Sequence, residues 1–230
     1  MHESSDEFEK TFIDTLPSKK AIWDGMGIDP WQLRDIKNFI EDRWFTRVVE
    51  FGSGASTEFI LRLAKKNNVK IDSFDNSEKY AFKCPENLSK FLNLYVVKTV
   101  QYNEKQYENI LDKNVITSKK RLILSQGIPV DELVVENKFD IKNAFYDISK
   151  GQLNGIYDLV ILDGPNGNGR NIAFAYLKEH VHPGTVIFID DYWHYDFIEN
   201  CKTILDAEVI SIVVKKHCHE NHGYAILKCK

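Results

Sequence analysis

The chain of 230 residues lacks the features that mark secreted, disulfide-rich and membrane proteins. Its four cysteines, Cys84, Cys201, Cys218 and Cys229, have no CxxC spacing and are too few for a disulfide framework. No apolar run is long enough to cross a bilayer, and the acidic N-terminus MHESSDEFEKTF lacks the basic and apolar regions of a secretory signal. We therefore expect a soluble, cytoplasmic protein in a reducing compartment.

The chain also lacks a strong excess of charge of either sign. A formal net charge of -4 provides no overall field that would gather nucleic acid or an anionic membrane. The short basic run at 119–121 is typical of a solvated face. With 43% hydrophobic and 28% charged residues, the composition is that of a globular domain. The expected partner is a small molecule, with neither nucleic acid nor a membrane involved.

Hydrophobic patterns predict an α/β fold. Strands and helices alternate along most of the chain, which indicates a doubly wound, mostly parallel, Rossmann-like sheet with helices on both faces. The last two predicted strands have no room for a helix between them, so one edge should be antiparallel. Strands are predicted over 46–51, 69–76, 92–100, 157–165, 184–192, 208–217 and 222–230, and helices over 30–44, 56–68, 169–181 and 195–205.

Two segments stand apart from this alternation. Residues 1–45 are interpreted as an N-terminal arm and helix that precede a domain over 46–230. The arm could pack on a neighbouring copy, so a homo-oligomer stays open. Residues 101–155 are too long for an ordinary connection, and we expect an insertion with its own helix and strand, acting as a lid over a site.

The stretch VVEFGSGASTEF (48–59) predicts a ligand-binding loop after the first strand of the domain. A dinucleotide fingerprint needs a third glycine after Gly52 and Gly54, and none is present. Glu50 would also repel a pyrophosphate at this loop. Asp75 ends the next strand, where a carboxylate can accept both hydroxyls of a ribose. These residues favour a positively charged nucleoside as the ligand and argue against NAD(P).

The segments EFGSGAST (50–57) and DSFDNSE (72–78) resemble the first two motifs of the class I S-adenosylmethionine-dependent methyltransferases. That family has a seven-stranded sheet with an antiparallel last strand, and the resemblance covers about 46–76 and 156–230. It implies S-adenosylmethionine as cofactor, with Glu50 near its ammonium group and Asp75 on its ribose. The remaining implied cofactor residues are Gly52, Ser53, Gly54, Ser56, Thr57 and Asn76.

Three acids follow two later predicted strands, in ILDGPNGNGR (161–170) and FIDDYWHYDF (188–197). Open α/β sheets bind ligands at the carboxyl ends of their strands, so Asp163, Asp190 and Asp191 should converge there. Unpaired acids so close together are costly, and Mg²⁺ would be the simplest positive partner. The alternative is that these acids cap loops, contact the cofactor or remain solvated.

The acid arrangement is similar to that of metal-dependent O-methyltransferases acting on catechols and sugars, whose metal lowers the pKa of an acceptor hydroxyl. Gly164-Pro165 departs from the catechol pattern and is similar to bacterial and sugar-acting enzymes, not all of which need a metal. The need for Mg²⁺ therefore stays open. The implied roles are catalysis by Asp163, Asp191 and His194, and acceptor binding by Arg170, Tyr192 and Trp193.

The catalytic role of His194 and the acceptor-binding roles of Arg170 and the aromatic residues each have a purely structural alternative. His194 could be a hydrogen-bonded structural residue, Arg170 a surface arginine, and the aromatic residues ordinary edge packing. His182 is placed at the opposite edge of the sheet and is not a candidate base. The run KHCHENH (216–222) is placed in a turn whose side chains diverge, which argues against zinc.

The resulting hypothesis is a methyltransferase that acts on a hydroxyl of a small molecule or sugar. An NAD(P)-dependent oxidoreductase and a non-catalytic binding module of the same fold are the alternatives.

Overall fold

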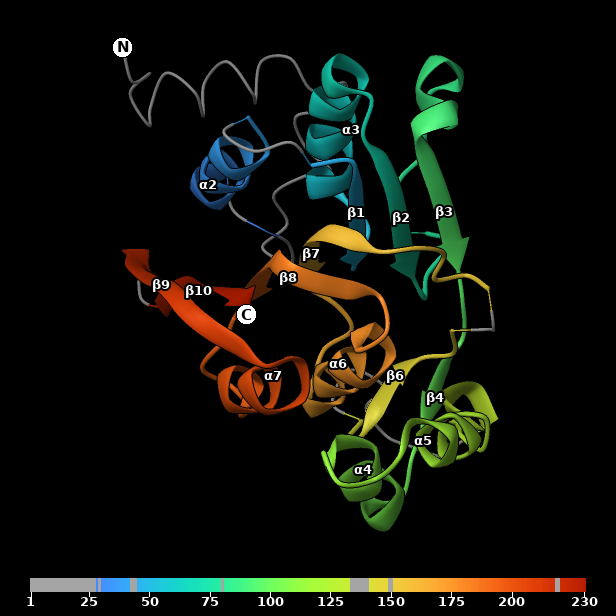
Figure 1. The fold of residues 1–230 in the computed structure, drawn as a ribbon. Helices are drawn as coiled ribbons and strands as arrows, with labels where there is room; N and C mark the ends of the chain where they lie inside the picture. The colour runs from blue at the N-terminus through green and yellow to red at the C-terminus, as the bar shows by residue number, and fades with distance from the viewer. Residues whose placement is uncertain are drawn as a thin grey trace.

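The computed structural model describes residues 28, 30–41, 45–79, 81–132, 141–148, 151–217 and 220–230. In these ranges the chain forms a seven-stranded sheet and a separate three-stranded sheet, with helices on both faces of the larger one (Figure 1). The predicted N-terminal arm and part of the 216–222 turn lie outside the described residues. No helix in the described part has the length and apolar character needed to cross a membrane.

The large sheet has the strand order β3-β2-β1-β7-β8-β10-β9, which confirms the predicted fold class. All neighbouring pairs are parallel except those of β10, which runs antiparallel to both β8 and β9. The last strand is therefore antiparallel, as predicted, and the closing pair of β10 and β9 forms one edge of the sheet, with β9 outermost. The bounds are β1 Arg47–Phe51, β2 Lys70–Asp75, β3 Leu92–Val96, β7 Tyr157–Leu162, β8 Val181–Asp190, β9 Ala207–His217 and β10 Glu220–Cys229.

The position of β10 follows from its apolar side chains. Tyr224, Ala225, Ile226 and Leu227 are all buried, and they alternate between the two apolar cores that cover the faces of the sheet. The strand β9 is more exposed and lies at the edge.

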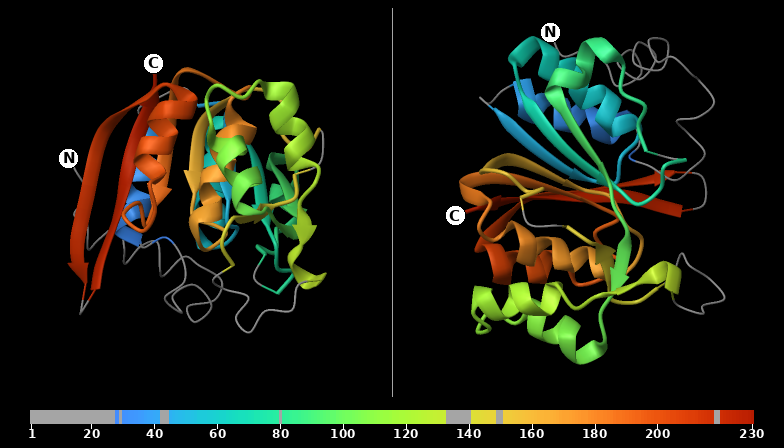
Figure 2. Two further views of the ribbon diagram at one scale, coloured as in Figure 1. Left: turned by 90° about the horizontal axis from the view of Figure 1, so that it is seen from below. Right: turned by 90° about the vertical axis from the view of Figure 1, so that its right-hand side faces the viewer.

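The helices divide into two layers, one on each face of the sheet (Figure 2). One layer contains α2 Pro30–Glu41, α3 Ala55–Asn67 and η1 Glu86–Phe91. The other contains α4 Glu104–Leu111, α5 Thr117–Leu124, α6 Ile172–Leu177 and α7 Phe197–Leu205. The predicted helix over 169–181 is observed as η3 Asn168–Asn171 followed by the short α6. It ends earlier than predicted because β8 already begins at Val181.

The segment predicted as an insertion packs onto the second layer and its core. The predicted strand 92–100 is divided, because β4 Thr99–Gln101 leaves the large sheet and pairs with β5 Ile128–Pro129 and β6 Ala144–Tyr146. Ile110 of α4 and Phe145 of β6 are fully buried in the same core as α6 and α7. Apolar burial on the main sheet therefore holds this segment in place.

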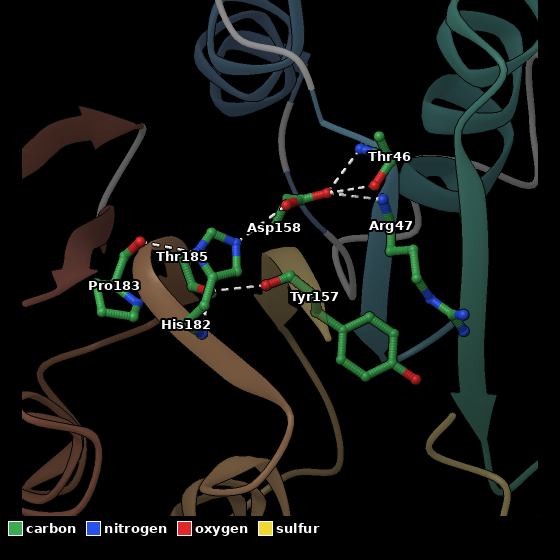
Figure 3. Close-up of polar contacts among 7 residues, drawn as sticks. All are labelled: Thr46, Arg47, Tyr157, Asp158, His182, Pro183 and Thr185. Atoms are coloured by element: carbon green, nitrogen blue, oxygen red, sulfur yellow. Dashed lines mark hydrogen bonds and ion pairs between the residues drawn. The ribbon is translucent and has the colours of Figure 1, made fainter. Parts of the chain in front are cut away.

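A carboxylate joins three strands at the edge where β1, β7 and β8 begin (Figure 3). Asp158 Oδ2 accepts hydrogen bonds from the Thr46 N–H at 2.6 Å, the Thr46 hydroxyl at 2.9 Å and the Arg47 N–H at 2.9 Å. Its other oxygen lies 3.1 Å from His182 Nε2. Burial acts to raise the pKa of Asp158, but these hydrogen bonds outweigh it and lower the pKa. His182 thus lies at the opposite edge from the predicted site, as expected.

We expect Asp158→Ala to lower the free energy of unfolding by about 2 kcal/mol, because it leaves two backbone N–H groups without their acceptor. The folded-state pKa of Asp158 is depressed, so its contribution is present at neutral pH and is lost as pH falls through that pKa. Urea titrations at pH 7 and pH 3 measure both effects. A loss of the same size at both pH values would contradict this assignment.

Candidate active site

The loop after β1 turns sharply and leaves space in front of it. Gly52 has a φ of +100°, and a Cβ atom added there would lie only 2.8 Å from the backbone nitrogen of Gly164. The loops after β1 and β7 are therefore in direct contact, and only glycine fits. A Cβ atom added at Gly54 would meet nothing within 4 Å. The loop thus faces open space that a ligand could fill.

Glu50 lies behind this loop and is fully buried. Its carboxylate accepts hydrogen bonds from the hydroxyls of Ser56 at 2.5 Å, Thr57 at 2.5 Å and Ser73 at 2.7 Å. Thr57 Oγ1 in turn accepts the Gly54 N–H at 2.9 Å. Burial raises the pKa of Glu50 to about 7, and the three hydroxyls oppose the rise. Glu50 therefore holds the loop from inside.

Asp75 stands at the end of β2, beside the same loop. Its carboxylate accepts the N–H groups of Ser53 at 3.0 Å and Ser77 at 2.8 Å, and it is 7% exposed. Burial raises the pKa of Asp75, while these backbone hydrogen bonds lower it. The Ser53 hydroxyl also accepts the Phe82 N–H at 2.8 Å, so it ties the glycine loop to the segment after β2. Asn76 follows Asp75 and is exposed.

The predicted convergence of acids at the ends of β7 and β8 is present. The carboxyl groups of Asp163 and Asp190 interact, and a hydrogen bond from Asp190 acts to lower the pKa of Asp163, which places the proton of that bond on Asp190. Gln32 of α2 donates its amide to Asp190 Oδ1 at 2.6 Å. Burial raises the pKa of Asp163 to about 7, whereas burial and the charges of Asp163 and Asp191 raise that of Asp190 well above its usual range. Asp190 is therefore the better site for the shared proton.

Arg170 supplies positive charge to these acids, and it is only 5% exposed. Its Nε donates to the Pro165 carbonyl at 2.8 Å and its Nη1 to the Asp190 carbonyl at 3.1 Å. The guanidinium opposes the rise in pKa of both Asp163 and Asp190. Arg170 is thus a buried residue that joins the two acid loops, and the alternative of a surface arginine is wrong.

The arrangement does not fit the predicted metal site. Within the described ranges, no three His, Cys, Asp or Glu side chains are grouped so that they could hold a metal ion. Asp190 is engaged by Gln32 and Asp163. Asp191 turns away from the strand direction with a φ of +50°, and its N–H donates to the Gly223 carbonyl at 3.1 Å. Asp163 and Asp190 therefore form an acid pair that holds a proton, with Asp191 as a neighbouring carboxylate, and this arrangement does not provide the ligand set that Mg²⁺ needs.

Two residues of this centre escaped the sequence analysis. Gln32 lies on α2, 158 residues from the acid it contacts. Tyr146 of β6 is 2% exposed, and its hydroxyl would lie 2.6 Å from a Cβ atom added at Gly164. Burial raises the pKa of Tyr146 well above its usual range, and the charges of Asp75 and Asp163 add to the rise. Neither residue belongs to a recognisable local pattern.

A polar cavity of about 640 Å³ opens next to the loop after β8. Its walls come from α4, η3, α7 and that loop, and include Tyr107, Asn168, Asn171, His194, Tyr195 and Asp196. The Asn171 amide donates to Tyr107 Oη at 3.2 Å, and the Asn200 amide donates to Asn171 Oδ1 at 3.1 Å. His194 is thus placed in a cavity wall.

The other predicted aromatic residues, Tyr192 and Trp193, precede His194 on the same loop. The rings of Tyr192 and Trp193 are perpendicular, with centroids 5.3 Å apart. Trp193 is 38% exposed and lies against β10, where a Cβ atom added at Gly223 would be 3.2 Å from its ring. The structure therefore places Trp193 against the sheet and His194 toward the cavity.

Comparisons with known proteins identify a family and several similar structures. A family model described as a methyltransferase domain matches residues 49–192. No curated protein sequence matches the chain significantly. A "putative O-methyltransferase" from Klebsiella pneumoniae has a similar structure, with a TM-score of 0.51 and 10% identity over 96% of this chain and 95% of that chain. For a precorrin-6y C5,15-methyltransferase from Geobacter metallireducens, the TM-score is 0.47 and the identity 13%, over 90% and 92%.

We expect Glu50→Gln to flatten the pH dependence of stability. The folded-state pKa of Glu50 lies above its unfolded value of 4.5, so the folded protein binds more protons between pH 4.5 and about 7. Stability contributed by this group therefore falls as pH rises through that window, by up to about 3 kcal/mol. Urea unfolding from pH 5 to pH 8 measures the slope, with the exposed Glu86→Gln as control. Equal slopes in wild type and Glu50→Gln would contradict the assignment.

Proposed function

We propose a function from one premise: this chain belongs to the family of methyltransferase domains whose model matches residues 49–192. It transfers a methyl group from S-adenosylmethionine to a hydroxyl of a small-molecule or sugar acceptor. S-adenosylmethionine supplies an activated methyl group when it is bound. The observation that supports this donor best is the open space in front of Gly54, on a loop whose Ser53 N–H is hydrogen-bonded to the carboxylate of Asp75.

The donor site uses residues on both sides of that space. Asp75 accepts hydrogen bonds from the ribose hydroxyls, with Asn76 flanking it, because an acid at the end of the second strand suits a nucleoside. Gly52, Ser53 and Gly54 form the adjacent wall. Glu50 does not touch the ligand; with Ser56 and Thr57 it keeps that wall in shape. This division of labour follows from which of these side chains are buried behind the loop.

The acid pair provides a base for the acceptor hydroxyl. A general base works best when its pKa lies near the working pH, and the pKa of Asp163 is about 7. Asp190 keeps the shared proton, so Asp163 is free to take the proton of the acceptor. Gln32 and Arg170 are positioning residues that hold Asp190 and its loop.

The acceptor lies next to the acids, toward the polar cavity. His194 lines this cavity and Asp191 lies three residues before it on the same loop, so the two can pass the proton on to solvent. Tyr192 and Trp193 form the rim on the side of the sheet. The amide and hydroxyl groups of the cavity suit an acceptor with several hydroxyl groups.

We expect calorimetric titration with S-adenosylhomocysteine to show micromolar binding, and Asp75→Ala to weaken it at least about tenfold, the cost of a lost hydrogen bond to a charged group. The matched control is Asp158→Ala, the same substitution at the opposite edge of the sheet, which should leave the affinity unchanged. NADH should not bind.

A flat titration with S-adenosylhomocysteine together with binding of NADH would favour the oxidoreductase. If both ligands fail to bind, the non-catalytic binding module becomes the better description.

Activity should rise with pH through about 7, because Asp163 acts in its deprotonated form. Formation of S-adenosylhomocysteine with a panel of catechols and sugars gives the rate. Asp163→Asn should lower that rate by about 100-fold or more, the usual contribution of a general base, and abolish the rise near pH 7. The exposed Asp131→Asn serves as control. A full rate in Asp163→Asn would remove this residue from the mechanism.

A further inference from the structure

The edge strand β9 exposes apolar side chains in a way that edge strands usually avoid. In the left view of Figure 2, β9 forms the outer border of the large sheet, and among the described residues no strand pairs with its outer side. Val209, Ile210, Ile212 and Val214 are 40%, 48%, 47% and 50% exposed. No charge or proline interrupts residues 209–214. Soluble proteins normally protect such an edge with charged residues, because its free N–H and C=O groups can pair with another strand.

Most of these apolar side chains lie on one face of the strand. In the register with β10, Val209 pairs with Leu227, and Ile212 pairs with Ala225. Leu227 and Ala225 point into the core under α7, so their neighbours on β9 share that face. Val214 pairs with Gly223, against which Trp193 packs. The exposed apolar surface therefore runs from Val209 along β9 to the ring of Trp193.

We propose that this edge binds a second copy of the chain, through antiparallel pairing of β9 with β9 around a two-fold axis at Ile212. In this register Ile212 of one copy lies opposite Ile212 of the second copy, and Ser211 of one copy lies opposite Val213 of the second. Ile210 has no partner in the pairing with β10, where the register shifts between Ile226 and Leu227. Because Ile210 is an extra residue in β9, it also shifts the register by one residue on the outer edge of β9, where the second copy would pair.

The shift brings matching residues together at both ends of the pair. Beyond Ile210, Val209 lies opposite Val214 of the second copy, and Glu208 lies opposite Lys215. In each of these pairs both positions belong to the same face of the sheet, as cross-strand neighbours must. A slip by one residue would place Ile212 opposite a residue of the other face.

The charges favour a second copy over an unrelated strand. A two-fold interface must be complementary to itself, because the same surface is used twice. With an acid at position 208 and a base at position 215, the antiparallel register forms two opposite-charge pairs, one at each end of the apolar centre. The two large sheets would become one continuous sheet.

Sedimentation equilibrium of the full chain tests the proposal. The wild type should have twice the chain mass of 26.7 kDa. Ile212→Lys should weaken dimerisation at least about tenfold, because it places two like charges on the axis in a desolvated position. Ile116→Lys, at a position that is 68% exposed but far along the chain from β9, should remain dimeric. Circular dichroism melting verifies that each variant is folded.

A charge exchange tests the register itself. Glu208→Lys and Lys215→Glu should each weaken self-association, because each variant puts like charges opposite each other. An equal mixture of the two variants should form a heterodimer, since both end pairs are then complementary again. A monomeric wild type would overturn the proposal and show that something other than a second copy covers β9. A mixture that fails to associate would also overturn it.

Discussion

The candidate site depends on one buried carboxylate that is satisfied entirely by hydroxyl groups. Glu50 would be costly in the core without partners, and Ser56, Thr57 and Ser73 provide three of them. These hydroxyls come from the start of α3 and from β2, so the same interactions fix β1, the helix after the loop and the neighbouring strand. The glycines allow the turn, but the hydrogen bonds behind it determine where the loop stands relative to Asp75.

Much of the architecture follows from local patterns in the sequence. Apolar runs such as YDLVILDGP identify the buried strands, and the acid, glycine loop and second acid predict a ligand at the carboxyl edge of the sheet. The ends of elements are less predictable. The predicted strand 92–100 is divided because Thr99 and Gln101 pair with short strands far along the chain, and no local property of these residues indicates that exchange.

The chemistry of the acid centre could be predicted only in part. Three acids at adjacent strand ends demand positive charge, and the sequence analysis assigned that demand to a metal. In the structure Arg170 and a shared proton meet it. Gln32 reaches Asp190 from a helix at the other end of the chain, and Tyr146 enters from a segment without readable periodicity. Contacts of this kind depend on the completed fold and leave no trace in spacing.

The place of β10 between β8 and β9 also sets an order of events during synthesis. The chain makes β9 before β10, yet β9 bonds to the sheet only through β10. Until β10 has been made, β9 has two open edges and an apolar face, and β8 lacks its outer neighbour. A nascent chain at this stage carries the complete glycine loop but an unfinished sheet, and its unpaired strand edges and apolar surface favour aggregation. The final strand closes the sheet from within and ends that interval.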